Sequence, residues 1–201
     1  MSTSFIFRPH VIETDSVVTP DILIDDVYVA ESGANTLKIS PITNDRLTPD
    51  PEIQVLGSET TADAAVLLVG AGAGMLIGLA SNHRHLNQGD PQMFSKPVCR
   101  QVWRFDDVAG HLKQLVIRAV GPKGDIFQEG MVGDLAPVEA IVPEVSGGNS
   151  KLPSGIAIMC VGLPFKEKVV SATSYSLTLS NPISGRQLEL LYSVRNLSLN
   201  N

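Results

Sequence analysis

The run AAVLLVGAGAGMLIGLA constrains the fold most, because the seventeen residues of Ala64–Ala80 include no charged or polar side chain. A membrane-spanning helix needs about 20 apolar residues, and Gly in a helix interior costs about 1 kcal/mol relative to Ala. The central GAGAG therefore disfavours a membrane span. We expect two buried strands, AAVLLV and MLIGLA, joined or bent through glycines that permit a tight turn, a bulge or the close approach of another backbone.

The same run invites comparison with the glycine-rich turn of a dinucleotide-binding fold. That fingerprint needs a third small residue where the helix packs on the strand. The third position is Met75 when counted from Gly70, and Ile77 when counted from Gly72, so both frames fail. The net charge of −6 also argues against a nucleic-acid binder, which normally carries a basic face. We expect no cofactor, no nucleic-acid partner and no membrane partner.

The rest of the chain consists of short apolar stretches separated by turn residues. Several of them alternate, as Tyr175, Leu177 and Leu179 do with Ser and Thr. This pattern indicates an all-β protein, a β-sandwich or a jelly-roll or barrel of short antiparallel strands. VEAIV at 138–142 is read as one of these strands. At most one short helix is expected, near 105–115, where Asp106 or Asp107 is suited to cap it.

The predicted organisation has four parts. Residues 1–21 form an extended N-terminal arm, 22–143 a sandwich-like body, 144–155 a loop or linker, and 156–201 C-terminal strands that complete the same β domain. The arm carries the apolar residues Phe5, Ile6 and Phe7. Two interpretations stay open: the arm adds as a strand to a neighbouring chain, or it is the first strand of its own fold.

The segment DDVYVAESGANTLKISPITNDRLTPDPEIQVLG, residues 25–57, combines an Asp pair, an ESG turn, a β-branched strand, an ND pair and a Pro/Asp turn. It resembles the opening of cadherin-like and immunoglobulin-like modules of bacterial surface proteins and phage virion proteins. The resemblance implies a β-sandwich. In that family such positions sometimes bind Ca²⁺, which makes calcium candidates of oxygen-bearing residues that are alternatively turn and strand-end residues: Asp25, Asp26, Glu31, Asn44 and Asp45.

Two histidines are the other metal candidates. In a strand, His83 and His85 of NHRH point to one face and could hold a transition metal. A third ligand would have to come from afar, for example from Asp90, and exposed loop histidines are the alternative interpretation. GxSxG does not occur, and Cys99 and Cys160 have no metal-binding spacing. The sequence thus supplies no recognisable nucleophile, and we predict that the protein is not an enzyme.

The pattern favours a structural protein of a virus particle. The predicted role is a bacteriophage capsid decoration or minor capsid protein, or a tail component, located in the virion and acting by oligomeric assembly. The reasons are the all-β pattern, the low charge, the lack of a signal-peptide pattern at the N-terminus and the immunoglobulin-like opening. The alternatives are a bacterial surface adhesion module and, third, a β-domain enzyme or ligand binder.

Partners would be other virion proteins and copies of the same chain, with a trimer as the expected assembly. Trp103 is both a candidate contact residue and, by the favoured interpretation, a core residue of the sheet. The candidate contact residues are apolar: Phe5, Ile6, Phe7, Trp103, Met131 and Leu135.

Overall fold

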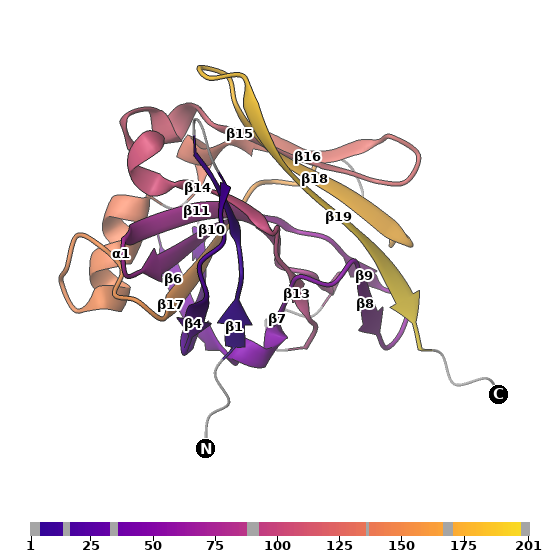
Figure 1. The fold of residues 1–201 in the computed structure, drawn as a ribbon. Helices are drawn as coiled ribbons and strands as arrows, with labels where there is room; N and C mark the ends of the chain where they lie inside the picture. The colour runs from indigo at the N-terminus through magenta and orange to yellow at the C-terminus, as the bar shows by residue number, and fades with distance from the viewer. Residues whose placement is uncertain are drawn as a thin grey trace.

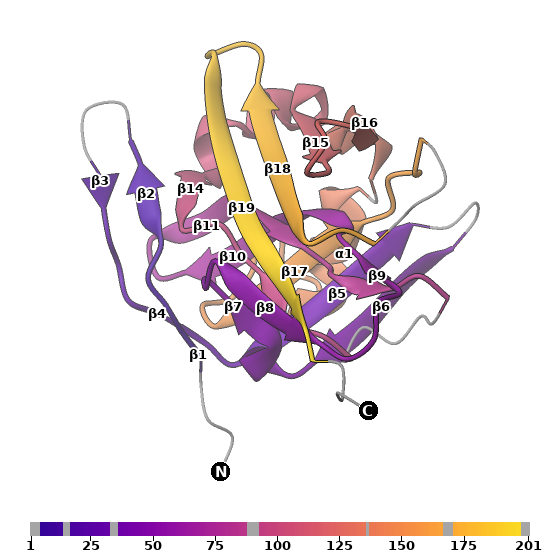
Figure 2. The ribbon, with the colours of Figure 1, turned by 90° about the vertical axis from the view of Figure 1, so that its right-hand side faces the viewer.

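Two large sheets form the body of the molecule. The computed structural model describes residues 5–13, 17–32, 36–87, 93–135, 137–166 and 171–197. A five-stranded sheet lies over an eight-stranded sheet, and the one α-helix of the described residues flanks one side (Figure 1). Figure 2 shows the long hairpin of β18 and β19 running across the eight-stranded sheet, where both strands contact β11.

Both sheets mix parallel and antiparallel neighbours. In spatial order the eight-stranded sheet contains β3 (Val17–Val18), β2 (His10–Ile12), β14 (Gln101–Arg104), β11 (Gly74–Ser81), β10 (Ala64–Ala71), β17 (Ile156–Val161), β5 (Asp26–Ser32) and β6 (Leu37–Ile42). The five-stranded sheet contains β16 (Ile126–Met131), β15 (Val116–Val120), β18 (Ser174–Asn181), β19 (Arg186–Asn196) and β8 (Glu52–Val55). Three small pairs are β1 (Phe5–Phe7) with β4 (Ile22–Ile24), β12 (Arg84–His85) with β9 (Thr60–Thr61), and β13 (Lys96–Pro97) with β7 (Leu47–Thr48).

The predicted all-β sandwich, jelly roll or barrel of antiparallel strands is wrong. β17 pairs in parallel with β5, β14 with β2, and β19 with β8, and all three pairs join segments far apart in the chain. Local alternation identifies strands but carries no information on such long-range parallel partners. The residues near 105–115 form the 3₁₀ helices η2 (Phe105–Asp107) and η3 (Ala109–Gln114), and η1 (Asn44–Arg46) and η4 (Val132–Asp134) are also 3₁₀ turns.

The α-helix α1 (Val138–Ser146) replaces the strand expected at 138–142. Its buried residues Val138, Ile141 and Val142 follow the spacing of one helix face rather than strand alternation. Gly147 ends the helix in the left-handed conformation, with φ of 68°, which glycine adopts without a steric penalty. The apolar content of VEAIV also fits a strand, but the buried residues of this segment follow the helical period. Within the described residues, no helix has the length and hydropathy needed to cross a membrane.

The apolar run of Ala64–Ala80 forms a two-stranded hairpin, as predicted. β10 and β11 pair antiparallel from Ala64 opposite Ser81 to Ala71 opposite Gly74. The close approach expected at the glycines is that of the chain's own backbone. A Cβ on Gly70 would lie 1.9 Å from the carbonyl oxygen of Pro153.

Both faces of this hairpin are buried, which explains why its sequence is continuously apolar. Val66, Leu68 and Ile77 belong to the core between the two sheets, together with residues of β15, β18 and β19. Leu67 and Val69 belong to a second core on the opposite face, which also holds Phe7 and Val102. β10 and β11 belong to the eight-stranded sheet, which is the middle of three layers. The five-stranded sheet covers one face of it, and the segments carrying Phe7, Ile22 and Leu47 cover the other.

The first 21 residues, expected as an extended arm, pack on their own chain over the described part. β1 pairs antiparallel with β4, and β2 pairs in parallel with β14. Residues 144–155 contain the end of α1 and the loop that passes Gly70, and β17, β18 and β19 lie in 156–201.

Candidate functional site

A cluster of buried polar side chains lies at the open end of the β10–β11 hairpin, opposite its turn. Asp63 directly precedes β10, and Asn82 and His83 directly follow β11. The amide of Asn82 donates a hydrogen bond of 2.8 Å to the carbonyl oxygen of Asp63, which keeps the two chain segments side by side beyond the sheet. The apolar strands thus end at the same level, and the polar residues that follow them are held between the two sheets.

Asp63 is fixed by Gln128, which comes from β16 of the other sheet. The Gln128 amide nitrogen donates hydrogen bonds of 2.9 Å to Asp63 Oδ1 and to the Leu163 carbonyl, and Gln128 Oε1 accepts one of 2.8 Å from the Ala64 amide. Burial raises the pKa of the Asp63 carboxyl above its usual range, although the Gln128 hydrogen bond and the Arg84 charge oppose this shift. A raised pKa makes this carboxylate a stronger base than an exposed aspartate, which is a property of carboxyl groups that transfer protons.

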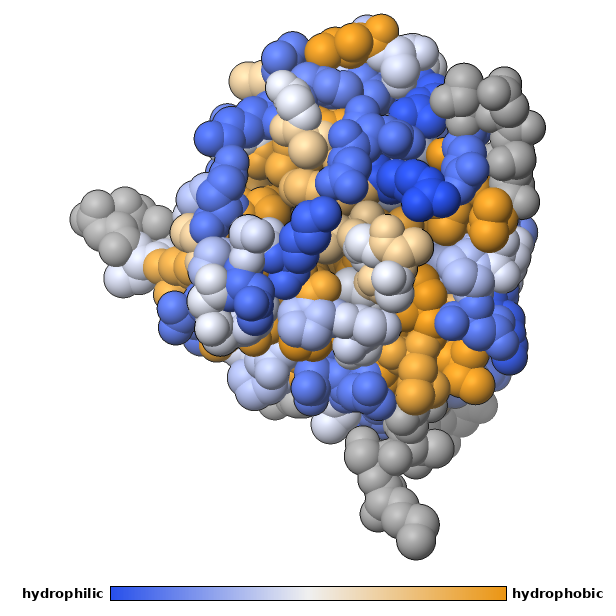
Figure 3. Space-filling model, turned by 60° about the vertical axis from the view of Figure 1, so that its left-hand side comes forward, coloured by the Kyte–Doolittle hydropathy of each residue, from blue (hydrophilic) through white to orange (hydrophobic). Residues whose placement is uncertain are grey.

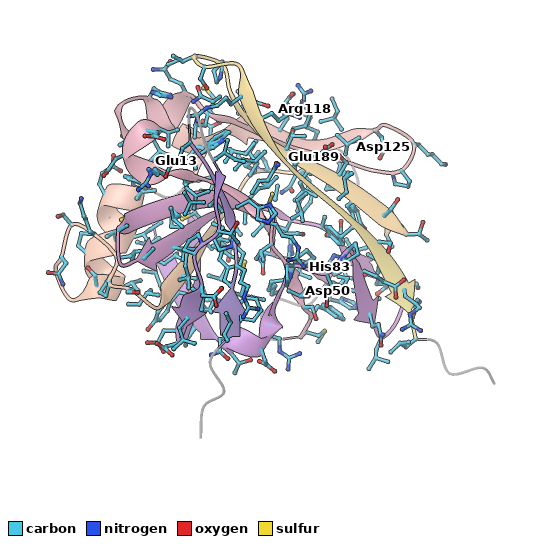
Figure 4. All side chains as sticks on the ribbon, in the orientation of Figure 1. Glu13, Asp50, His83, Arg118, Asp125 and Glu189 are labelled. Atoms are coloured by element: carbon cyan, nitrogen blue, oxygen red, sulfur yellow. The ribbon has the colours of Figure 1, made fainter. Side chains whose placement is uncertain are left out.

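His83 is fully buried and lies among aromatic rings. Its ring is edge-on to Phe94, Tyr175 and Tyr192, with ring centroids 5.8–5.9 Å apart. Nδ1 lies 3.1 Å from the Tyr192 hydroxyl, which is itself 2.8 Å from Ser81 Oγ. Desolvation, and then the charge of Lys96, lower the pKa of His83 to about 3. The imidazole is therefore neutral at physiological pH, and Figure 4 shows it inside the body of the molecule.

Two cationic side chains accompany these residues. Lys96 at the start of β13 is fully buried, and its Nζ donates a hydrogen bond of 2.7 Å to the His83 carbonyl oxygen. Arg84 Nε lies 3.3 Å from Asp63 Oδ2, and the guanidinium lies over the Phe165 ring at 5.3 Å from its centroid. The side chain of Arg84 is 32% exposed, so it connects the buried cluster to solvent.

Three consecutive residues of the cluster each have a buried polar atom without a hydrogen-bond partner. These atoms are Asn82 Oδ1, His83 Nε2 and Arg84 Nε, and Arg46 Nε is the remaining such side-chain atom in the described ranges. Native structures pair nearly all buried polar groups, so three orphaned atoms in adjacent residues mark a place for bound water or ligand. Together with Asp63, they form a site that can bind a polar molecule and transfer a proton.

The metal candidates do not gather in the part of the chain that the structure describes, where no group of three or more His, Cys, Asp or Glu residues could hold an ion. His83 faces Tyr192, whereas His85 Nε2 is 3.7 Å from Glu59. Asp90 lies outside the described residues.

The calcium candidates lie directly before β5 (Asp25), in β5 (Asp26 and Glu31) and in η1 (Asn44 and Asp45). Asn44 is buried and donates hydrogen bonds to the carbonyl oxygens of Ile24 and Asp25. Asp26 and Glu31 lie near opposite ends of β5, and Asp45 lies 3.9 Å from Arg46.

The candidate contact residues fall into a buried and an exposed group. Phe7, Trp103 and Leu135 belong to the core, whereas Ile6 and Met131 are about half exposed and Phe5 is partly buried. On the face that Figure 3 shows, hydrophobic residues alternate with hydrophilic ones over the α1 side of the molecule. Homo-oligomerisation, with a trimer as the expected form, stays a prediction.

The hairpin turn at the other end of β10 and β11 borders a hollow of about 450 Å³. Its lining is largely apolar and includes Ile22, Ala71 and Met75, with Asp21 and Arg104 among the charged residues. Size and apolar lining make this hollow a conventional candidate for a ligand site. None of the described residues with an orphaned polar atom lines this hollow. Three of these residues, Asn82, His83 and Arg84, lie at the opposite end of the hairpin, and the fourth is Arg46.

Comparison with solved structures identifies the fold. A 2-hydroxyhepta-2,4-diene-1,7-dioate isomerase from Mycobacterium marinum has 16% identity, with 94% of this chain and 84% of that chain covered and a TM-score of 0.62. A yeast protein of the fumarylacetoacetate hydrolase family has 9% identity, 88% and 95% coverage and a TM-score of 0.63. A maleylpyruvate hydrolase from Sphingobium sp. SYK-6, solved with manganese(II) and pyruvate, has 12% identity, 90% and 74% coverage and a TM-score of 0.61.

The chain therefore has the fold of fumarylacetoacetate hydrolase-family proteins. It belongs to the family described as "Protein of unknown function (DUF2848)", whose model matches residues 27–192. No curated protein matches the sequence.

These findings correct the resemblance and the functional prediction. The cadherin-like and immunoglobulin-like interpretation of residues 25–57 is wrong, because that segment forms β5, β6, η1, β7 and β8, which belong to three different sheets of another fold. The predictions of a virion structural protein, of a location in the virion and of a non-enzymatic role are also wrong, since the fold is that of hydrolases and isomerases. The adhesion alternative depended on the same resemblance.

Sequence reasoning found His83 but missed its neighbours. Lys96 follows His83 by 13 positions and Gln128 follows Asp63 by 65, and neither belongs to a motif of its own. The signal present in the sequence was the abrupt change from an apolar strand to the polar triplet Asn82–Arg84.

Proposed function

We propose that the protein is an enzyme, a hydrolase or isomerase that acts on a small keto or enol carboxylate at the open end of the β10–β11 hairpin. The observation that carries the proposal is the set of orphaned buried atoms at Asn82, His83 and Arg84, next to a buried carboxyl group. The substrate class follows the neighbours of the same fold, which include maleylpyruvate hydrolase and 2-hydroxyhepta-2,4-diene-1,7-dioate isomerase.

Each residue of the site has a role that its environment supports. Asp63, held by Gln128 and with a pKa raised by burial, transfers the proton between substrate and solvent. Neutral His83 presents Nε2 as a hydrogen-bonding atom within a rigid aromatic surround. Arg84 reaches solvent and is suited to bind the carboxylate of the substrate, because a guanidinium presents paired donors to a carboxylate.

A panel of acylpyruvates and 2-hydroxymuconate-type enols tests the function. Purified protein is expected to deplete the ultraviolet absorbance of at least one member. The isosteric variant Asp63→Asn is expected to lower kcat about 100-fold or more, the usual size of a general acid–base contribution. Arg118→Gln is the control, because Arg118 pairs with Glu129 on the exposed side of the five-stranded sheet, away from His83 in Figure 4. Folded protein that turns over no member of the panel contradicts the proposal.

A further inference from the structure

The manganese that accompanies pyruvate in the Sphingobium neighbour raises the question of whether this site would hold a divalent cation. Mn²⁺ and Mg²⁺ prefer oxygen ligands, mainly carboxylates and water, and a stable protein site supplies several of them. The residues around the open end of the hairpin do not fit this requirement. Asp63 is the only carboxylate with a direct contact to Gln128, Asn82 or Arg84 in the described ranges, and no group of three ligands occurs there.

The charges in the cluster also disfavour a divalent cation. Arg84 lies 3.3 Å from Asp63 and already occupies the position at which an ion would contact that carboxylate. Lys96 is buried behind His83, and its charge lowers the pKa of the imidazole. A divalent cation placed against Asp63 would be repelled by the Arg84 guanidinium, and water would screen this repulsion little, because Asp63 is buried.

The same charges suit an anion. Arg84 directs its Nε toward Asp63 Oδ2 at 3.3 Å, but its side chain is 32% exposed and its guanidinium lies over the Phe165 ring. A small carboxylate can approach this group from solvent and accept two parallel hydrogen bonds from it. Asn82 Oδ1 is a further buried polar atom without a hydrogen-bond partner, on a residue that shares with Arg84 its contact to Asp63.

We propose that Arg84 binds the carboxylate of a small 2-oxo acid directly, so that substrate binding needs no divalent metal. This inference rests on the proposed function and specifies how its substrate is held. It predicts that the chain differs from its manganese-bound neighbour in metal dependence while sharing its fold.

Calorimetry on the full-length protein tests this inference without an activity measurement. After treatment with EDTA, the protein is titrated with pyruvate and with oxalate, first in chelator and then with Mn²⁺ present. Mn²⁺ alone is titrated in parallel, and its binding is followed by the loss of the paramagnetic resonance signal of the free ion. For each anion, we expect the affinity in chelator and the affinity with Mn²⁺ present to agree within about two-fold. We expect no stoichiometric binding of Mn²⁺ alone.

Charge variants identify the residue responsible. Arg84→Gln is expected to weaken the binding of both anions at least about ten-fold, Arg84→Lys to restore part of the affinity, and Arg118→Gln to leave it unchanged. Thermal melting of each variant shows that it is folded. If the anions bind only when Mn²⁺ is bound, or do not bind at all, the inference is overturned. If the protein turns over a substrate but requires a divalent metal, this inference fails while the proposed function is supported. The failure of the inference is therefore distinguishable from the failure of the proposed function.

Discussion

The two ends of the β10–β11 hairpin differ in how completely they are packed and paired. At the turn, a bordering hollow is mostly apolar, and the backbone of Pro153 lies against Gly70 so closely that a side chain cannot fit. At the open end, beside Asp63, residues 82–84 each hold a buried polar atom without a hydrogen-bond partner. The comparison shows that one rigid hairpin, buried on both faces, positions a set of incompletely satisfied polar groups at one end only.

The largest effect is expected at the turn end. Gly70→Ala places a methyl group 1.9 Å from the Pro153 carbonyl oxygen, so the 152–153 backbone must move. We expect a loss of about 3 kcal/mol or more in the free energy of unfolding, measured by urea denaturation. Gly72→Ala is the matched control, since its Cβ would have nothing within 4 Å. Equal stability of the two variants would show that the hairpin is not clamped at this end.

An intermediate effect on the free energy of unfolding is expected when the pH is lowered, because His83 lies at the open end. The pKa of His83 is about 3 in the folded protein, against 6.5 for an unperturbed histidine, so the unfolded chain binds the proton more readily. The contribution of the neutral His83 imidazole to the free energy of unfolding is fully present above pH 6.5 and is lost as the pH falls toward 3. Between pH 7 and 5 the loss is about 2 kcal/mol.

His83→Phe isolates this contribution, because phenylalanine suits the aromatic surround and does not titrate. The raised pKa of Asp63 acts in the opposite direction in both proteins, so it cancels in the comparison. Urea denaturation at the two pH values is expected to show a smaller loss of stability in the variant. Parallel pH profiles of the wild type and variant would contradict a buried, neutral His83.

The smallest effect is expected at the edge of the cluster. Tyr192→Phe removes a hydroxyl that lies 2.8 Å from Ser81 Oγ and 3.1 Å from His83 Nδ1. Because Ser81 Oγ and His83 Nδ1 lose this partner, we expect the free energy of unfolding to fall by about 1–2 kcal/mol. The double variant Tyr192→Phe with Ser81→Ala should recover part of this loss in urea denaturation. A Tyr192→Phe variant as stable as the wild type would mean that water replaces the hydroxyl, and that the cluster is wetter than its burial indicates.

The local elements were more predictable than their arrangement. The Ala64–Ala80 run specifies a buried hairpin because its apolar residues are continuous and its only breaks are glycines. Val138–Ser146 was misread because five apolar-rich residues fit both a strand and a helix. The parallel pairing of β5 with β17 joins residues about 130 positions apart, for which no local signal exists.

The site was partly predictable for the same reason. His83 stands out in the sequence as a histidine at the end of an apolar strand. Its aromatic surround comes from Phe94, Tyr175 and Tyr192, and Gln128 reaches Asp63 from the other sheet, 65 positions away. Only the folded chain shows that these groups share one buried cluster. The interpretation of His83 as an exposed loop histidine is wrong, since its side chain is fully buried through contacts that the sequence does not encode locally.

A crystal structure of the protein with pyruvate or oxalate tests most directly whether the open end is the binding site. Our account predicts that the ligand carboxylate lies within hydrogen-bond distance of the Arg84 guanidinium, next to Asn82 and His83. A ligand bound instead in the hollow at the turn, among residues such as Ala71 and Met75, would contradict it.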